Sequence, residues 1–124
     1  MPQLIPTPTT IPVPGGKIID EHVGRVNSDT DAVSVAHMKA PGDWTEPFQT
    51  PEFDEVTLVL AGAVLVDHEG GQLRVEAGQS VITRGGERIR YSTGPDGAEY
   101  VAVCLPAFSP ETVHRDDDAS EGDA

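Results

Sequence analysis

The chain of 124 residues has a single cysteine and few basic residues, and it has no apolar run long enough to span a membrane. One cysteine excludes an internal disulfide. Eight Lys and Arg residues stand against 21 acidic ones, giving a formal net charge of −13. Nucleic acids and anionic membranes are bound by basic surfaces, so the composition argues against both as partners. Because no N-terminal stretch resembles a signal peptide, we expect a soluble cytoplasmic protein.

Thirteen glycines and eleven prolines favour short strands joined by turns over long helices. The length fits one domain with its own core. Strand-like segments, separated by turn signals, occupy residues 16–26, 32–40, 55–70, 71–78, 79–86, 88–93 and 98–105. The last two are separated by Gly-Pro-Asp-Gly at 94–97, which predicts a turn. About eight short strands at near-regular spacing predict an all-β sandwich or barrel.

The two ends of the chain differ from the middle. Residues 1–16 alternate Pro with Thr and aliphatics, which predicts an extended arm without a ladder of its own, either disordered or laid along a neighbour. Residues 17–115 are the expected barrel domain, and residues 116–124 are expected to form an acidic disordered tail. Near the end of the barrel domain, Ser109 and Pro110 predict the start of a short helix, as N-cap and first-turn residue.

Two segments have informative spacing. In QTPEFDEVTLVLAG (49–62), Glu55 precedes an apolar run that ends at Gly62. In residues 78–93, Gly78 begins a stretch that contains an Arg-Gly-Gly turn and ends in RIRYST. Position by position, residues 42–93 resemble the paired motifs of the cupin superfamily, whose fold is a small double-sheet jelly-roll β-barrel. The resemblance therefore implies an all-β cupin barrel.

The metal ligands of the cupin motifs are replaced in this sequence. The resemblance implies three imidazoles and a carboxylate, but Gln49, Pro51 and Ile89 stand at the histidine positions and only Glu55 matches. One carboxylate is a poor site for Zn²⁺, Mn²⁺ or Fe²⁺, which need several nitrogen or charged oxygen donors. The four histidines are scattered along the chain and predict no substitute cluster. We expect no metal and no other cofactor.

Residues 33–107 resemble a narrower group, the metal-free EutQ-type cupins associated with ethanolamine utilisation. The resemblance is carried by Phe53-Asp54-Glu55 before the apolar run, by AGQSVITRGGERIRYSTGP (77–95) and by EYVAVCLPA (99–107). It implies a barrel with an acidic, metal-free interior, linked in that setting to acetate or acyl-phosphate chemistry. The Pro-rich arm and the tail depart from that family.

Glu55 is the candidate catalytic residue. Side chains alternate along a strand, so Glu55 should point inward with Gln49 and Phe53. Burial in an apolar barrel raises the proton affinity of a carboxylate and suits it to acid/base work near neutral pH. The alternative is a structural glutamate satisfied by a tyrosine hydroxyl or by an arginine such as Arg90.

Five further residues are candidates for substrate binding, and each has a structural alternative. Gln49 would orient a polar group of the substrate or cap a strand, and Tyr91 would donate a phenolic hydrogen bond or pack in the core. His37 lies on a strand expected to flank the pocket but suits a structural role as well. Arg90 would clamp a carboxylate or pair with an acid across a strand pair. Trp44 would close the mouth or fill a dimer seam.

Two functional hypotheses follow from these residues. The first is a metal-independent cupin that binds a small polar molecule and uses Glu55 for lyase or isomerase chemistry. The second is a non-catalytic cupin that binds a ligand or serves in assembly. In both cases we expect a homodimer, because small cupins leave an apolar outer face and sheet edges uncovered.

Overall fold

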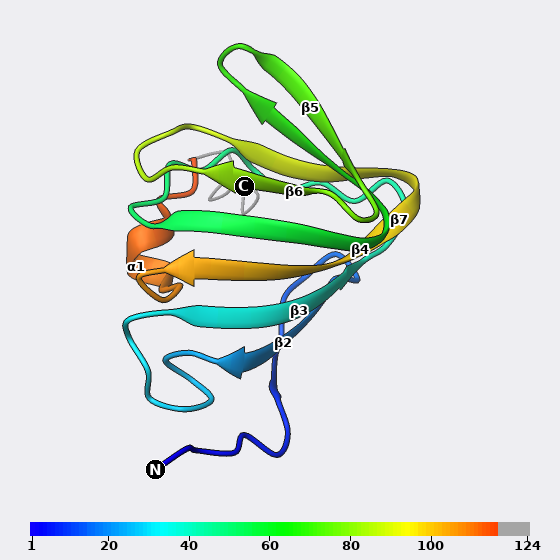
Figure 1. Ribbon diagram of the computed structural model, residues 1–124. Coiled ribbons are helices and arrows are strands. Elements are labelled where there is room, and N and C mark those ends of the chain that lie inside the picture. The colour runs from blue at the N-terminus through cyan, green and yellow to red at the C-terminus, as the bar shows by residue number, and fades with distance from the viewer. Residues whose placement is uncertain (117–124) are drawn as a thin grey trace.

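The computed structural model describes residues 1–116 of the chain, and there it is an antiparallel β structure with one short helix (Figure 1). The elements are β1 (Thr9–Ile11), β2 (Ile18–Val23), β3 (Ser34–Ala40), β4 (Asp54–His68), β5 (Gly71–Glu76), β6 (Ser80–Thr83), β7 (Arg90–Leu105) and α1 (Pro110–Val113). The strand order is β1-β2-β3-β7-β4-β5, and β6 pairs with β4. The all-β prediction is confirmed. No helix within these residues has the length and apolarity needed to cross a membrane.

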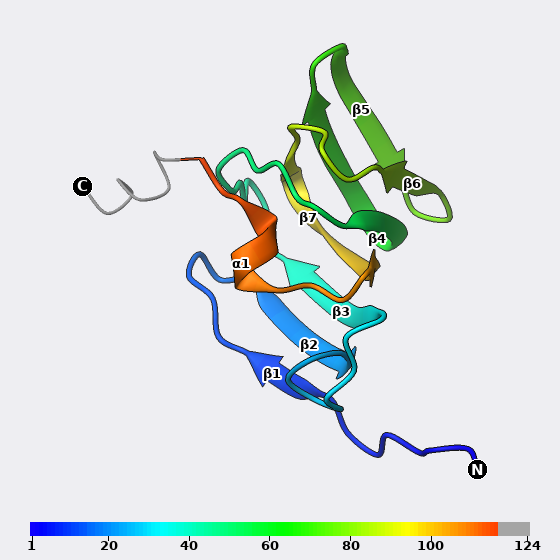
Figure 2. The same ribbon diagram turned by 90° about the vertical axis from the view of Figure 1, so that its left-hand side faces the viewer.

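The long strands β4 and β7 pair with each other on both sides of a shared bend. Val56 lies opposite Val103 before the bend, and Val66 lies opposite Tyr91 after it. The register of β4 shifts on both sides of Gly62, as bulges do where a sheet turns sharply. The bend, at the right-hand edge of Figure 1, folds the sheet into two layers that Figure 2 shows from the open end.

Glycine is required at the bend because two backbones approach closely there. Gly62 has φ of 73°, and a Cβ on it would lie 2.2 Å from the Gly97 carbonyl oxygen. The predicted turn at 94–97 is different in the structure, where β7 continues through it. Gly62 pairs with Ala98 and Val64 with Thr93, so residues 94–97 bulge opposite a single residue of β4. The two strands predicted on either side are therefore one strand.

The Pro-rich arm is partly built into the sheet. Thr9 pairs with Glu21 and Ile11 with Ile19, so the prediction that residues 1–16 have no ladder is wrong for β1. The three residues of β1 are β-branched and suit a strand, while Pro8 and Pro12 lie just outside it, where no ladder hydrogen bond is needed.

The C-terminal segment closes one end of the barrel. Ser109 caps α1 as predicted, its Oγ accepting a hydrogen bond from the Glu111 amide. Val113 of α1 packs against Phe53 and Cys104, and α1 lies across the opening between the two layers in Figure 2. The first residue of the predicted tail, Asp116, is held by its amide hydrogen bond to the Phe48 carbonyl. The rest of that tail lies outside the described residues.

Candidate functional site

A cavity of about 280 Å³ lies between the layers of the barrel, beside α1. Its walls on β3 and β7 carry small inward side chains, among them Ser34, Ala36, Ala102 and Cys104. Small residues on these two neighbouring strands leave the space that larger ones would fill in a packed core. Burial raises the pKa of the Cys104 thiol, so Cys104 contributes to the wall as a small apolar residue and not as a nucleophile.

Polar and charged groups gather on one part of the cavity wall. They come from the segment before β2, the loop before β4, the strands β4 and β7, and the segment after α1. The set consists of Lys17, Glu46, Gln49, Glu55, Tyr91 and Arg115. The remaining wall is largely apolar, so the cavity suits a small molecule with one polar and one apolar side.

Glu55 lies on the inward face of β4, as the alternation predicted, and is 9% exposed. Its pKa is raised to about 7, chiefly by burial and then by the negative charge of Glu46, while the charge of Lys17 and the Tyr91 hydroxyl oppose the rise. The Tyr91 hydroxyl also shares a hydrogen bond of 2.9 Å with Thr83. Glu55 therefore has the pKa of an acid/base group near neutrality, and the Tyr91 hydroxyl affects that pKa.

Two buried oxygen atoms in the cavity wall have no hydrogen-bond donor among the described residues. They are Oε2 of Glu46 and Oε1 of Gln49. The backbone of Gln49 is fixed by two hydrogen bonds to Ile89, each of 2.9 Å, so its side chain starts from a rigid position. Buried acceptors are normally satisfied. These two oxygens are thus placed to accept hydrogen bonds from a molecule in the cavity.

Lys17 faces the same cavity from the residue that precedes β2. Its Nζ lies 4.3 Å from the centroid of the Trp44 ring and 5.5 Å from that of Tyr100. Within residues 1–116, none of the ion pairs shorter than 4 Å involves Lys17, Glu46 or Glu55. Burial lowers the pKa of Lys17, although the charges of Glu46 and Glu55 act in the other direction.

The structure brings three of the six predicted site residues together at the cavity: Glu55, Gln49 and Tyr91. Trp44 is buried and touches the site through Lys17 but does not line the cavity. His37 points to the outer face, where its Nε2 lies 2.6 Å from Glu99.

Arg90 lies outside the cavity. It pairs with Asp67 across the β4–β7 strand pair, at 2.9 and 3.0 Å, as one of the two sequence interpretations had it. The alternative in which Glu55 is sealed against this arginine therefore does not apply. The guanidinium of Arg90 pairs with Asp67 outside the cavity, and the carboxylate of Glu55 lines the cavity.

Three groups of the site were missed by the sequence analysis: Lys17, Glu46 and Arg115. Lys17 had a readable signal, because it shares strand parity with Ile19 and Glu21, and all three line the cavity. Glu46 and Arg115 lie outside regular strands, where no periodicity indicates which way a side chain points. Glu21 is a contrasting case, since its carboxylate accepts hydrogen bonds from the amides of Val26 and Asn27 and has a structural role.

The residues at the cupin metal position do not fit a metal ion. Gln49 and Glu55 are the oxygen donors there, and the other motif positions carry Pro51 and Ile89, which have no donor side chains. No group of three or more His, Cys, Asp or Glu side chains in residues 1–116 is arranged to hold an ion. The expectation of a metal-independent protein stays a prediction.

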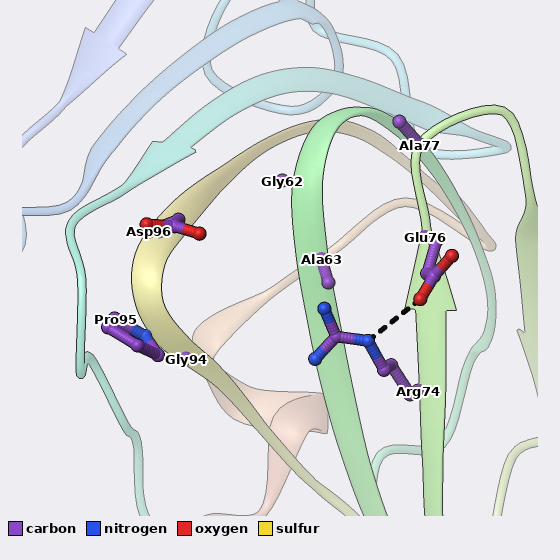
Figure 3. A pocket seen from close by; sticks show the side chains of 9 residues that line it. Gly62, Ala63, Arg74, Glu76, Ala77, Gly94, Pro95 and Asp96 are labelled. Atoms are coloured by element: carbon purple, nitrogen blue, oxygen red, sulfur yellow. Dashed lines mark hydrogen bonds and ion pairs between the residues drawn. The ribbon is translucent and has the colours of Figure 1, made fainter.

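A second hollow lies at the β4–β7 bend, away from α1. It has a volume of about 350 Å³ and is bordered by Gly62, Ala63 and the bulge at 94–97. Figure 3 shows Arg74 and Glu76 on its rim, joined by an ion pair of 2.9 Å. Both side chains are largely exposed, at 60% and 61%. The hollow is open, and Arg74 and Glu76 on its rim neutralise each other.

The fold is shared with solved cupin structures. The ethanolamine utilisation protein Q of Salmonella typhimurium superposes with a TM-score of 0.60 at 24% identity, covering 74% of this chain and 71% of that one. The EutQ protein of Clostridium difficile gives 0.61 at 20% identity, covering 73% and 63%. Oxalate decarboxylase of Bacillus subtilis gives 0.74 at 16% identity, covering 87% of this chain and 30% of that one. The chain thus has the cupin jelly-roll fold, and its predicted resemblance to EutQ-type cupins is confirmed at the level of the fold.

Sequence comparison gives a different kind of relative. No protein-family model matches the chain. A protein of Myxococcus xanthus (strain DK1622) named endoribonuclease YbeY is 45% identical over 107 residues, which cover 86% of this chain and 36% of that protein. The chain therefore spans about a third of the length of the curated relative that it matches. The name describes that longer protein.

Proposed function

We propose that the barrel cavity binds a small polar molecule and that Glu55 serves there as an acid/base group in lyase or isomerase chemistry. The observation that carries the proposal is a buried carboxylate with a pKa of about 7, which faces a cavity beside two donorless acceptors. A group that titrates near the working pH is effective in both directions of proton transfer. The acceptors on Glu46 and Gln49 favour a ligand that brings hydrogen-bond donors, such as hydroxyl or amino groups.

The test compares Glu55→Gln with Glu76→Gln as a matched control at the other end of the barrel. Native mass spectrometry and thermal-shift screening of small hydroxy, amino and carbonyl compounds identify ligands, and NMR follows any turnover of the hits. Glu55→Gln should lower turnover by about 10²-fold or more, because it removes the transferable proton and keeps the shape. Glu76→Gln should leave turnover unchanged. Equal turnover in wild-type and Glu55→Gln proteins would remove Glu55 from the chemistry.

A second candidate is a non-catalytic ligand-binding or assembly module. It is favoured by the Myxococcus relative, in which the matching segment is about a third of a longer protein named as an endoribonuclease. Because of its net charge of −13, this chain is not expected to bind RNA. In the longer protein it would instead bind a protein partner. The rest of the Myxococcus protein, expressed separately, should then bind this chain in analytical ultracentrifugation. Absence of binding at micromolar concentrations would reject the candidate.

The acetate or acyl-phosphate role implied by the EutQ resemblance is a third hypothesis. It is tested by including acetate and acyl phosphates in the ligand screen.

A further inference from the structure

Lys17 is held in the cavity by a turn that the sequence builds from two glycines. Gly15 and Gly16 have φ of 86° and 81°, and Gly15 packs beside the Trp44 ring. The turn returns the chain from the Pro-rich arm into β2, and Lys17 is the first residue after it. Its side chain then shares the inward face with Ile19. A long flexible side chain at this position would normally extend into water, but this one is directed into the barrel.

The surroundings of Lys17 differ from those of a structural lysine. A lysine directed into a protein interior usually has an ion-pair partner. Lys17 is half-buried, and within residues 1–116 no carboxylate lies within 4 Å of its Nζ. The nearby acid Glu46 has a buried Oε2 without a donor, so the two groups lie in one cavity without neutralising each other by contact. The faces of Trp44 and Tyr100 hold the ammonium form, whereas burial favours the neutral amine.

We propose that Lys17 is a nucleophile that forms an imine with a small aldehyde or ketone bound in the barrel cavity. This inference rests on the proposed function of the cavity as a ligand site and names the class of its substrate. A desolvated lysine with access to a cavity is the form in which an amine attacks a carbonyl carbon. The apolar wall of the cavity accommodates the hydrocarbon part of such a compound.

The atoms balance with the groups present. Neutral Lys17 Nζ attacks the carbonyl carbon, one amine proton moves to the oxygen, and a carbinolamine results. Protonated Glu55 then gives its proton to the hydroxyl group, water leaves, and the nitrogen lone pair forms a protonated imine. The Glu55 carboxylate next takes a proton from the carbon beside the imine carbon, which yields an enamine and restores protonated Glu55. One residue with a pKa of about 7 thus serves both proton transfers.

The sequence contains an internal control for the test, because Lys17 and Lys39 are its two lysines. Lys39 is exposed on β3 and faces away from the cavity. The full chain is incubated at pH 7 with pyruvate or propanal and cyanoborohydride, which reduces an imine to a stable amine. Peptide mass spectrometry then gives the rate of labelling at each lysine. Lys17 should be labelled at least tenfold faster than Lys39 with one or both compounds, and Glu55→Gln should slow Lys17 alone by at least tenfold.

The outcomes separate this inference from the function on which it rests. Labelling of Lys17 at or below the rate of Lys39 with both compounds overturns the imine. Lactate and propan-1-ol, which have a hydroxyl group in place of the reactive ketone or aldehyde, are measured in parallel by thermal shift. A second outcome is a thermal shift in the wild-type protein that is absent in Glu55→Gln, without preferential labelling of Lys17. It would support the ligand site and reject Lys17 as a nucleophile. If neither a thermal shift nor preferential labelling of Lys17 is observed, the result counts against both proposals.

Discussion

The two ends of the barrel carry similar charged residues in opposite surroundings. At the bend, Arg74 and Glu76 are about 60% exposed and pair with each other. Beside α1, Glu55 is buried, and its pKa rises to about 7 without an ion-pair partner within the described residues. The carboxylate of Glu76 is exposed and ion-paired, whereas that of Glu55 is buried and suited to proton transfer. The difference is made by burial and not by residue type.

The ends also differ in what fixes their shape. At the bend, backbone meets backbone, and glycine is the residue that fits. At the cavity, small side chains on β3 and β7 leave space, and the polar groups around it are incompletely satisfied. One end is constrained sterically and the other carries an electrostatic cost. Substitutions at the two ends should therefore change the stability of the protein for different physical reasons, which can be measured separately.

The largest effect is expected for Gly62→Ala at the bend. The new Cβ would lie 2.2 Å from the Gly97 oxygen, at a φ of 73°. A left-handed conformation costs about 1–2 kcal/mol and overpacking against backbone about 1–3 kcal/mol, so we expect a loss of about 4 kcal/mol in the free energy of unfolding. Gly78→Ala is the matched control, because Gly78 has φ of 88° and open space around it. It should lose only about 1–2 kcal/mol in urea unfolding. Equal losses would show that the close approach of β4 and β7 is not what requires glycine.

The bend also shows how far the sequence predicts the fold. Alternation along β4 placed Glu55 inward correctly, because strand parity is a local property. The Gly-Pro-Asp-Gly segment predicted a turn, but β4 bends beside it and keeps β7 paired on both sides, which is a tertiary effect. Thr9–Ile11 was likewise recognised as extended but not as paired, since its partner is another strand.

The site was less predictable than the fold. Glu55 was placed from strand parity, and Gln49 from the same parity and from its position in the motif. His37 had the wrong parity for the cavity, and its pairing with Glu99 shows the outer face to which it belongs. Glu46 could not be found from the sequence because its orientation is set by loop geometry. Lys17 was overlooked although its parity was readable.

The next effect is a dependence of stability on pH at the cavity. The pKa of Glu55 in the folded state, about 7, lies above its ordinary value of 4.5. The folded protein therefore binds this proton more tightly than the unfolded chain does. Stability due to this group is complete below about pH 4.5 and is lost as the pH rises through 7, a change of about 3 kcal/mol. Glu55→Gln mimics the protonated form and should not show that loss.

Urea unfolding of wild-type and Glu55→Gln proteins between pH 4.5 and 8 measures the difference. As the pH rises over this range, the free energy of unfolding of Glu55→Gln should increase by about 3 kcal/mol relative to that of the wild type. The control Glu76→Gln should follow the wild type at every pH. A constant difference between wild type and Glu55→Gln would mean that Glu55 is not desolvated, and the contrast between the two ends would lose its basis.

A smaller effect is expected on self-association, which tests the predicted homodimer. The outer face of the sheet is apolar around Leu58, which lies opposite Val101 of β7 and is 43% exposed. Leu58→Glu should weaken a dimer formed through this face at least tenfold, or about 1.4 kcal/mol. Leu73→Glu is the control, since Leu73 is equally exposed, at 48%, on the β5 hairpin. Sedimentation equilibrium gives both dissociation constants. A monomeric wild-type chain would refute the dimer.

Deletion of the Pro-rich arm is a poor test of the same dimer. β1 pairs with β2 of its own chain, and residues 11–13 line the cavity. Removal of residues 1–14 would therefore lower the melting temperature whether or not the chain dimerises. The surface substitution at Leu58 separates the two effects because it leaves the intramolecular ladder intact.

The smallest effect is expected for Arg74→Ala on the rim of the open hollow. Arg74 and Glu76 lie two residues apart on β5, and their ion pair of 2.9 Å is exposed at both partners. Solvent screens such a pair, and ordering two long side chains opposes it, so the free energy of unfolding should change by less than about 0.5 kcal/mol. Unfolding in urea at low and high salt checks this, and the two values should agree. A loss above about 1 kcal/mol would give the charges at the bend a structural role and would make the two ends of the barrel more alike than their exposure indicates.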